Sequence, residues 1–290
     1  MSKNGILISV AGDQNGSKIE GSGRNEPKII TPDDPFPIDN TPYQIGRFRV
    51  PGATPFGSYG ERDASSAESN FVVWPNGPFQ IPPATGVQMS IVSTSGNDAL
   101  AGTNVQTIEI HYLDSNLEDG VEILEMDGLT PVLTTATDIR FIQCMHIQQF
   151  GDTAEAAGDI TASYDDGGGP VTYSQISQGD TRCSSSARMI PANKYGFVAG
   201  AVAGAVSGTS AARVTVRLVA SELDNNQYLD EQFMLIPHGS VSVQDTSLGY
   251  NFPIPLRFNP GTVIALTLST DKAAIVSGSW FGWTENKVTA

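Results

Sequence analysis

Residues 107–150 decide the fold: the stretch begins TIEIHYLD, continues through SNLEDG and VEILEMDG, and ends IRFIQCMHIQQF. Ile108, Ile110 and Tyr112 alternate with Thr107, Glu109 and His111, which is the two-residue period of a half-buried strand. SNLEDG supplies the Asn, Asp and Gly residues that favour turns. A second alternating segment follows it, and a third begins at Arg140. These segments predict an antiparallel meander of three strands.

The rest of the chain repeats this pattern. Strand-like segments recur at intervals of roughly 8 to 15 residues, separated by Gly, Pro and Asn, as in β-sandwiches and jelly rolls. Even the weakly polar run FVAGAVAGAV at residues 197–206 is typical of a buried strand. No amphipathic pattern long enough for a helix stands out. We therefore predict an all-β protein made of antiparallel β-sandwich or jelly-roll regions.

Three regions follow from the composition along the chain. Residues 1–65 are rich in Gly, Pro, Asn and Asp but keep scattered apolar residues, which predicts an extended N-terminal arm ordered on another surface rather than a separate domain. A disordered tail is the alternative interpretation. Residues 66–175 are expected to form a first β-sandwich domain, and residues 176–290 a second β-sandwich or jelly-roll domain.

Charge narrows the classes of partner. Only 16% of the 290 residues are charged, and the net charge is −15 from 16 basic and 31 acidic side chains. An average soluble domain has about 25% charged residues, so neutral polar side chains must cover more of the surface in this protein. Such an acidic chain repels nucleic acid and anionic membranes. No N-terminal targeting signal and no run of about 20 apolar residues is present, so neither secretion nor a membrane span is predicted.

Two acidic segments invite a calcium interpretation. The first, DSNLEDG, offers clustered oxygen ligands, but its glycine falls one place too late and no bidentate glutamate closes the loop. A hairpin turn is the preferred interpretation. Asp165 and Asp166 precede three glycines and predict an exposed loop tip. The oxygen-bearing residues of the first segment are Asp114, Asn116, Glu118 and Asp119.

Histidine and cysteine are scarce. His111 and His146 lie on predicted strands and could approach each other across a sheet, but the third histidine, His238, is far away in sequence. No H-x-H, HExxH or CxxC spacing is present, so we predict no metal site and no cofactor. Cys144 is expected to be a small buried hydrophobic residue, although a disulfide with Cys183 is geometrically feasible.

No catalytic motif supports an enzyme. The serines of CSSSA, residues 184–186, lack the glycines of a nucleophile elbow, and the glycines at 167–169 lack the Lys-Ser/Thr of a phosphate loop. Four aromatic residues in a Pro-rich segment could stack on a sugar, although packing into their own domain is the commoner outcome. These are Phe56, Tyr59, Trp74 and Phe79. We therefore expect no catalytic, cofactor-binding or metal-binding residues.

Several local patterns resemble virion structural proteins of tailed bacteriophages. The chain has an ND-x-x-x-G-T loop before a strand ending in Y-L-D, a G-x-T-P-V turn, and a later SSARMIPA strand start. The residues are Asn97, Asp98, Gly102, Thr103, Tyr112, Leu113, Asp114, Glu122, Gly128, Thr130, Pro131, Val132 and 185–192. The resemblance covers about residues 70–290, and it implies a β-sandwich component of the particle without catalysis. It transfers no site residues.

The resemblance and the composition together predict a capsid decoration, or cement, protein. Such a protein is made in the host cytoplasm, forms a homotrimer and binds the major capsid protein or other virion proteins on the capsid surface, here with residues 1–65 as the docking arm. The alternative is a tail, neck or baseplate/fibre component that binds host-surface glycans. A lectin-like or depolymerase-like β-sandwich is a third class.

Overall fold

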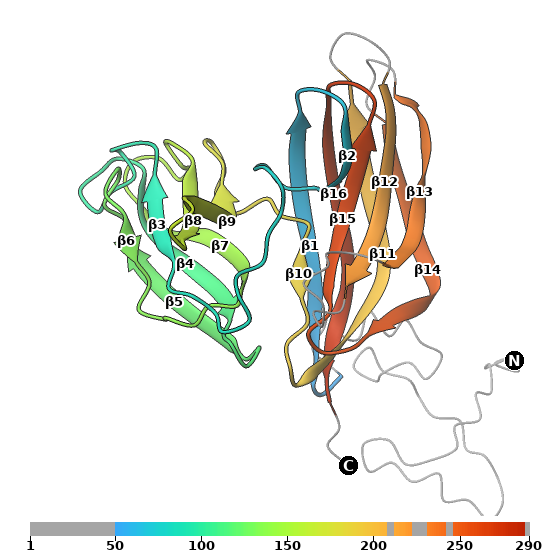
Figure 1. The fold of residues 1–290 in the computed structure, drawn as a ribbon, viewed down its shortest axis with the longest axis horizontal. Coiled ribbons are helices and arrows are strands. Elements are labelled where there is room, and N and C mark those ends of the chain that lie inside the picture. The colour runs from blue at the N-terminus through green and yellow to red at the C-terminus, as the bar shows by residue number, and fades with distance from the viewer. Residues whose placement is uncertain (1–49, 208–211, 222–230, 242–245, 288–290) are drawn as a thin grey trace, which may run out of the picture. The chain divides into compact units, whose positions relative to one another are not determined.

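The computed structural model describes residues 50–207, 212–221, 231–241 and 246–287 (Figure 1). Every regular element in these ranges is a β-strand, and the sheets are antiparallel, which confirms the all-β prediction. Across the same ranges, no helix combines the length and hydrophobicity that crossing a membrane requires. Most of the predicted arm, residues 1–49, lies outside the described residues.

Two sheets pack face to face in what we call the large sheet pair. One sheet has the order β1 (Ala53–Ala64), β16 (Ala274–Asn286), β11 (Lys194–Val206), β14 (Thr246–Phe258). The other has the order β10 (Arg188–Met189), β15 (Val263–Thr270), β12 (Ala212–Ser221), β13 (Glu231–Val241), and β2 (Glu68–Val72) also pairs with β15. Long strands of the two sheets run across each other's faces (Figure 1).

The core of the large sheet pair is built mainly from Ala, Val and Leu around one large ring. Trp280 is fully buried, donates from Nε1 to the Ser186 carbonyl at 2.7 Å, and meets Phe56 edge to face at 5.3 Å. Facing strands β11 and β12 fill the remaining space with small side chains such as Ala201, Ala203 and Val214. Small residues let the two sheets approach closely, while Trp280 and Phe258 contribute the aromatic rings of the cluster.

Seven shorter strands form the small sheet pair. One sheet has the order β6 (Val132–Leu133), β3 (Ser90–Ser93), β8 (Ile160–Asp165), β9 (Pro170–Ile176), and the other has the order β5 (Asp119–Glu125), β4 (Val105–Leu113), β7 (Phe141–Phe150). Larger apolar side chains from both sheets fill the core between them. Fully buried members are Met89, Ile91, Ile108, Ile110, Met145 and Ile160.

The predicted meander is correct in its strands but wrong in their order. Residues 107–150 do form β4, β5 and β7, yet β4 is the central strand and β7 pairs with it rather than with β5. The reason is β6, which leaves this sheet to pair with β3 in the facing sheet, so that the chain returns on the other side of β4. Val121 and Ile123 of the edge strand β5 are exposed because they point to the outer face of this sheet, opposite His111 and Glu109 of β4.

A buried carboxylate organises the loops of the small sheet pair. Asp98 has no solvent exposure and accepts four hydrogen bonds. One comes from the Ser93 hydroxyl at 2.6 Å, and three come from the backbone amides of Val105, Ala157 and Gly158 at 3.2, 2.9 and 3.0 Å. These donors belong to three separate chain segments, so the single side chain ties the segments together.

Residues 52–290 form one compact unit, and the two sheet pairs share an apolar cluster within it. Trp74, Leu113, Phe141, Val219 and Ala265 are buried in this cluster and come from both pairs. The backbone adds a hydrogen bond from the Ala192 amide to the Leu117 carbonyl at 3.0 Å.

The structure moves the predicted boundaries. Residues 53–64 are not part of an arm, because β1 pairs with β16 along its whole length. Residues 68–72 form β2 and belong with β15 of the large sheet pair, not with a domain of residues 66–175. Both differences have one cause, which is that the large sheet pair draws strands from the two ends of the described chain.

Candidate functional site

Three potential metal ligands meet on the outer face of the sheet β5-β4-β7. Ile108 and Ile110 of β4 point into the core, so Glu109 and His111, which alternate with them, point outward. The register then brings His146 of β7 opposite Glu109. The strand ladder therefore places one carboxylate and two imidazoles on neighbouring positions of a rigid surface.

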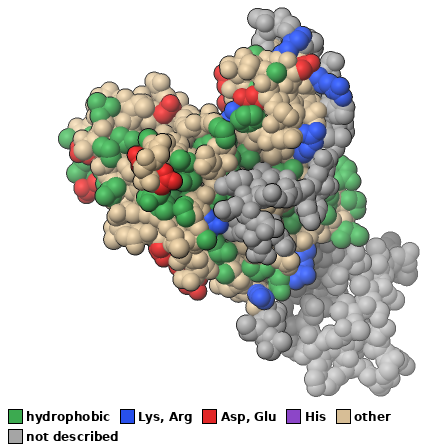
Figure 2. Space-filling view, viewed as in Figure 1, with side chains coloured by type: hydrophobic (Ala, Val, Ile, Leu, Met, Phe, Trp, Pro, Cys, Tyr) green, Lys and Arg blue, Asp and Glu red, His purple; other side chains and the backbone are tan. Residues whose placement is uncertain are grey.

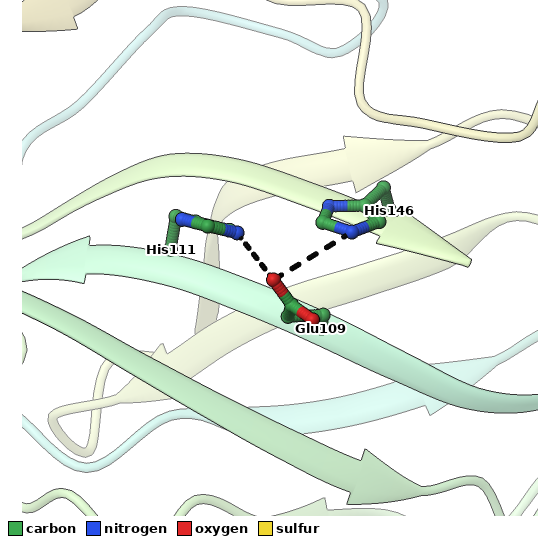
Figure 3. A group of neighbouring side chains, drawn as sticks. All are labelled: Glu109, His111 and His146. Carbon is green, nitrogen blue, oxygen red and sulfur yellow. Dashed lines mark hydrogen bonds and ion pairs between the residues drawn. The ribbon is translucent and has the colours of Figure 1, made fainter. Parts of the chain in front are cut away.

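The two histidine side chains point to the same carboxylate oxygen of Glu109 (Figure 3). His111 Nε2 donates a hydrogen bond to Glu109 Oε1 at 2.6 Å, and His146 Nε2 lies 3.7 Å from the same oxygen. The two imidazole rings stack with their centroids 5.4 Å apart and an interplanar angle of 29°. The side chains are half-buried, with 22% of Glu109, 36% of His146 and 42% of His111 exposed.

His111 and His146 line a pocket of about 410 Å³ whose other wall is the large sheet pair. Phe56 of β1 contributes an apolar surface to that wall, and Arg188 and Lys194 contribute positive charge. Lys194 Nζ lies 3.1 Å from Asp119 Oδ2, an ion pair that bridges β11 and β5 at the pocket. Asp119 balances the charge of Lys194, so the pocket combines two imidazoles with the guanidinium groups of Arg182 and Arg188, which suit an anionic ligand.

A pair of free thiols lies beside the histidines. Cys144 is directly opposite His111 in the register, and its Sγ is 3.6 Å from Cys183 Sγ. The hydrogen bond that Cys183 donates lowers the pKa of the Cys144 thiol, with further help from Arg188 and Arg182 and against the effect of burial. Donating that bond, together with burial, raises the pKa of Cys183 well above its usual range. The Arg182 guanidinium is 3.8 Å from Cys144 Sγ and would stabilise a thiolate there.

The other residues weighed from the sequence have structural roles. Asp114 Oδ1 accepts the amides of Asn116 and Glu118 at 2.8 and 2.9 Å, so it shapes the hairpin turn as predicted. Asp165 likewise accepts the amides of Gly167 and Gly169 at an exposed loop tip. The Ser186 hydroxyl donates to the Leu266 carbonyl at 3.1 Å and so joins its segment to β15.

The four aromatic candidates are divided between core and surface. Trp74 is buried and meets Phe79 edge to face at 5.5 Å, and Phe56 packs against Trp280. Tyr59 alone remains substantially exposed, at 48%. Packing into the protein is therefore the outcome for three of them, although Phe56 also lines the pocket.

The approach of His111 to His146 was foreseen from the sequence, but Glu109 was not considered as a ligand. The available signal was its position two residues before His111, because residues i and i+2 of a strand share a face. His238 is in β13, and its side chain lies outside the described residues. Cys144 is buried as expected, and Cys183 is its neighbour.

Comparison with known proteins gives little further information. No protein-family model matches the chain. No curated protein is similar to it in sequence. One solved structure with limited similarity is that of infectious bursal disease virus Gt strain. The match has 11% sequence identity and a TM-score of 0.22, and it covers 82% of this chain and 76% of that chain. A VP2 subviral particle of the same virus gives 10% identity, a TM-score of 0.21, and coverage of 82% and 78%. Scores this low do not support an assignment of fold or function.

Proposed function

We propose that the protein is a non-catalytic structural component of a virion, and that it attaches to the assembled bacteriophage head as a capsid decoration protein. The proposal rests on the all-β architecture, the sequence resemblance to phage virion proteins and the character of the surface. Wide neutral polar and apolar areas separate the few charged side chains on the face in Figure 2. Neutral polar groups cost less to remove from water than charged groups, so this surface suits extensive contact with neighbours.

One sheet face carries the proposal. The outer face of β1-β16-β11 presents Tyr59, Val202, Ile275 and Phe281, each between 42% and 48% exposed. They alternate with residues such as Ala201 and Trp280 that fill the core, so they point away from it. Much of the face between them is Gly and Ser, including Ser279 opposite both Tyr59 and Val202. We call this surface the outer apolar face.

The outer apolar face explains how attachment would be achieved. Its apolar part, with glycine between the larger side chains, can lie closely against another protein, while Glu61 and Asp63 of β1 are exposed on the same face, opposite Ser277 and Ile275. The expected partner is the major capsid protein or another virion protein, and we expect the protein to bind as a homotrimer. Because it would bind only the assembled shell, attachment would stabilise the shell by mass action.

Immunogold labelling of purified virions is the first test. Label spread over the head would support decoration. Label confined to the tail, neck or baseplate would favour the alternative role as a tail or fibre component, with host-glycan binding as the next property to measure. Virions without label would contradict the virion proposal altogether.

A second experiment tests the face itself. Heads that lack the protein are incubated with purified wild type or with the Val202→Ser/Phe281→Ser variant, and bound protein is measured after sedimentation. We expect the variant to lose at least about 90% of attachment, since two central apolar contacts account for a large share of binding energy in most interfaces. Val121→Ser/Ile123→Ser on β5, which removes two similarly exposed apolar side chains elsewhere, is the matched control. Equal attachment of both variants would reject the outer apolar face as the contact.

A further inference from the structure

We propose that Glu109, His111 and His146 bind a divalent transition-metal ion of the zinc type. The three ligand atoms lie within 4.8 Å of one another. Two imidazole nitrogens and one carboxylate oxygen form a ligand set that selects zinc and its neighbours over calcium and magnesium, which prefer oxygen ligands. This property is independent of attachment to a virion.

The distances fit a metal after small side-chain movements. Ligand atoms about 2.0–2.1 Å from a tetrahedral Zn²⁺ are separated from one another by roughly 3.3 Å. The two separations from Glu109 Oε1 are 2.6 Å to His111 Nε2 and 3.7 Å to His146 Nε2, one shorter and one longer than this value. Rotation of the Glu109 carboxylate away from His111 and toward His146 would equalise them. The backbone need not move, because all three residues are on strands.

The position of the ligands on adjacent strands keeps the site organised. Glu109 and His146 are directly opposite each other in the β4–β7 ladder, and His111 follows two residues along β4. The buried side chains of Ile108, Ile110 and Met145 fix this ladder from below. Rigid strands lower the entropy that the ligands lose on binding, which favours affinity for a site with only three protein ligands.

Three protein ligands leave one tetrahedral position open, and the pocket determines what can fill it. Both histidines line the pocket together with the guanidinium groups of Arg182 and Arg188, whereas Lys194 is paired with Asp119. These positive charges favour a negatively charged fourth ligand, such as a carboxylate, over a neutral one. The site would therefore hold zinc with an anion-accepting position that faces the pocket.

Zinc titration of the purified full chain tests the proposal. Isothermal titration calorimetry near neutral pH, in a buffer that does not chelate metal, is expected to show one Zn²⁺ bound per chain. Replacing Zn²⁺ with Co²⁺ should give the visible absorption bands of a four-coordinate ion, and an excess of Mg²⁺ should not displace it. Zinc should also raise the thermal unfolding midpoint, because it binds the folded state.

Variants assign the ligands. His111→Ala and His146→Ala should each weaken Zn²⁺ binding at least about tenfold, and the double variant should abolish both the Co²⁺ bands and the thermal shift. Glu109→Gln should weaken binding less, since the amide oxygen can still coordinate the metal, although less well than a carboxylate. Glu125→Gln, on the adjacent strand β5, makes the same charge change without removing a ligand and should bind like wild type. Circular dichroism checks that each variant is folded.

The outcomes separate a metal site from a simple hydrogen-bonded cluster. Absence of Zn²⁺ binding by wild type would overturn the proposal and leave Glu109 and His111 as a hydrogen-bonded pair. Binding that survives in the His111→Ala/His146→Ala variant would overturn it as well, because the metal would then be held elsewhere. His238→Ala serves in that case to test the remaining histidine.

Discussion

The two sheet pairs use the same type of element but reach stability by different means. The large sheet pair has strands of up to 13 residues and a core of small side chains around Trp280. Its outer apolar face presents four large apolar side chains, with Glu61 and Asp63 on the same face of β1. The small sheet pair has shorter strands, larger core residues and a buried carboxylate that holds its loops. It presents two imidazoles and the Cys144 thiol to the pocket.

This difference separates two tasks within one compact unit. Long strands with small core residues create an extended surface, which suits contact with a large partner. Short strands joined by hydrogen-bonded loops fix individual side chains at defined positions, which suits a small ligand. All three tryptophans, at positions 74, 280 and 283, lie outside the strands of the small sheet pair. Trp280 and Trp283 therefore report the large sheet pair, and Trp74 reports the apolar cluster shared by the two pairs, whereas circular dichroism reports the strands of both pairs.

Trp280→Ala is expected to produce the largest change, because it empties the centre of the large sheet pair and removes the hydrogen bond to Ser186. The free energy of unfolding should fall by about 3–5 kcal/mol. Urea denaturation followed by fluorescence of the remaining tryptophans measures it. Trp280→Phe keeps most of the ring and should cost clearly less. Equal losses in the two variants would show that ring volume is not what stabilises this core.

Asp98→Ala is the substitution expected to destabilise the small sheet pair most. It leaves three buried backbone amides without their acceptor, and we expect a loss of about 2–4 kcal/mol. Asp114→Ala is the control, since Asp114 also accepts two amides but lies in an exposed turn, and it should cost at most about 1 kcal/mol. Urea curves recorded by circular dichroism and by fluorescence should separate in Asp98→Ala. Coincident curves would show that the two sheet pairs unfold together, which would contradict the expectation that the small sheet pair unfolds first in this variant.

Oxidation should stabilise the small sheet pair by a smaller amount. Treatment with diamide is expected to join Cys144 and Cys183, each thiol giving up one proton and one electron as diamide is reduced to its hydrazine. A bridge across this loop should add about 2 kcal/mol, at the lower end of the usual range because the sulfur atoms must move closer. Mass spectrometry of unreduced peptides detects the bridge, and Cys183→Ser provides the control. Two titratable thiols remaining after treatment would refute the prediction.

Phe281→Ser should have the smallest effect on folding. Its side chain lies on the outer apolar face, so the free energy of unfolding should change by no more than about 0.5 kcal/mol, although attachment to heads should be weakened. Urea denaturation of the purified variant gives the value. A loss comparable to that of Trp280→Ala would mean that Phe281 is part of the core and that its effect on attachment is indirect.

Local patterns in the sequence predicted the strands better than their partners. The alternation in residues 107–150 identified β4, β5 and β7, and the run at 197–206 lies within β11. The pairing of β1 with β16 could not be foreseen, because Ala53 and Glu285 are near opposite ends of the described chain and no local pattern links them. The same limit applies to the site. His111 and His146 were noted, but only the register shows that Glu109 lies between them.

The pairing of β1 with β16 also sets an order of events during synthesis. Strand β1 leaves the ribosome before the small sheet pair, whereas its hydrogen-bonding partner β16 emerges after it. The small sheet pair is encoded without interruption between them and can fold while translation continues. The large sheet pair cannot be completed before β16 emerges, so β1 remains unpaired while the intervening residues are made. A nascent chain truncated before residue 274 should therefore contain a folded small sheet pair and an exposed β1 that is open to chaperone binding or to pairing with another chain.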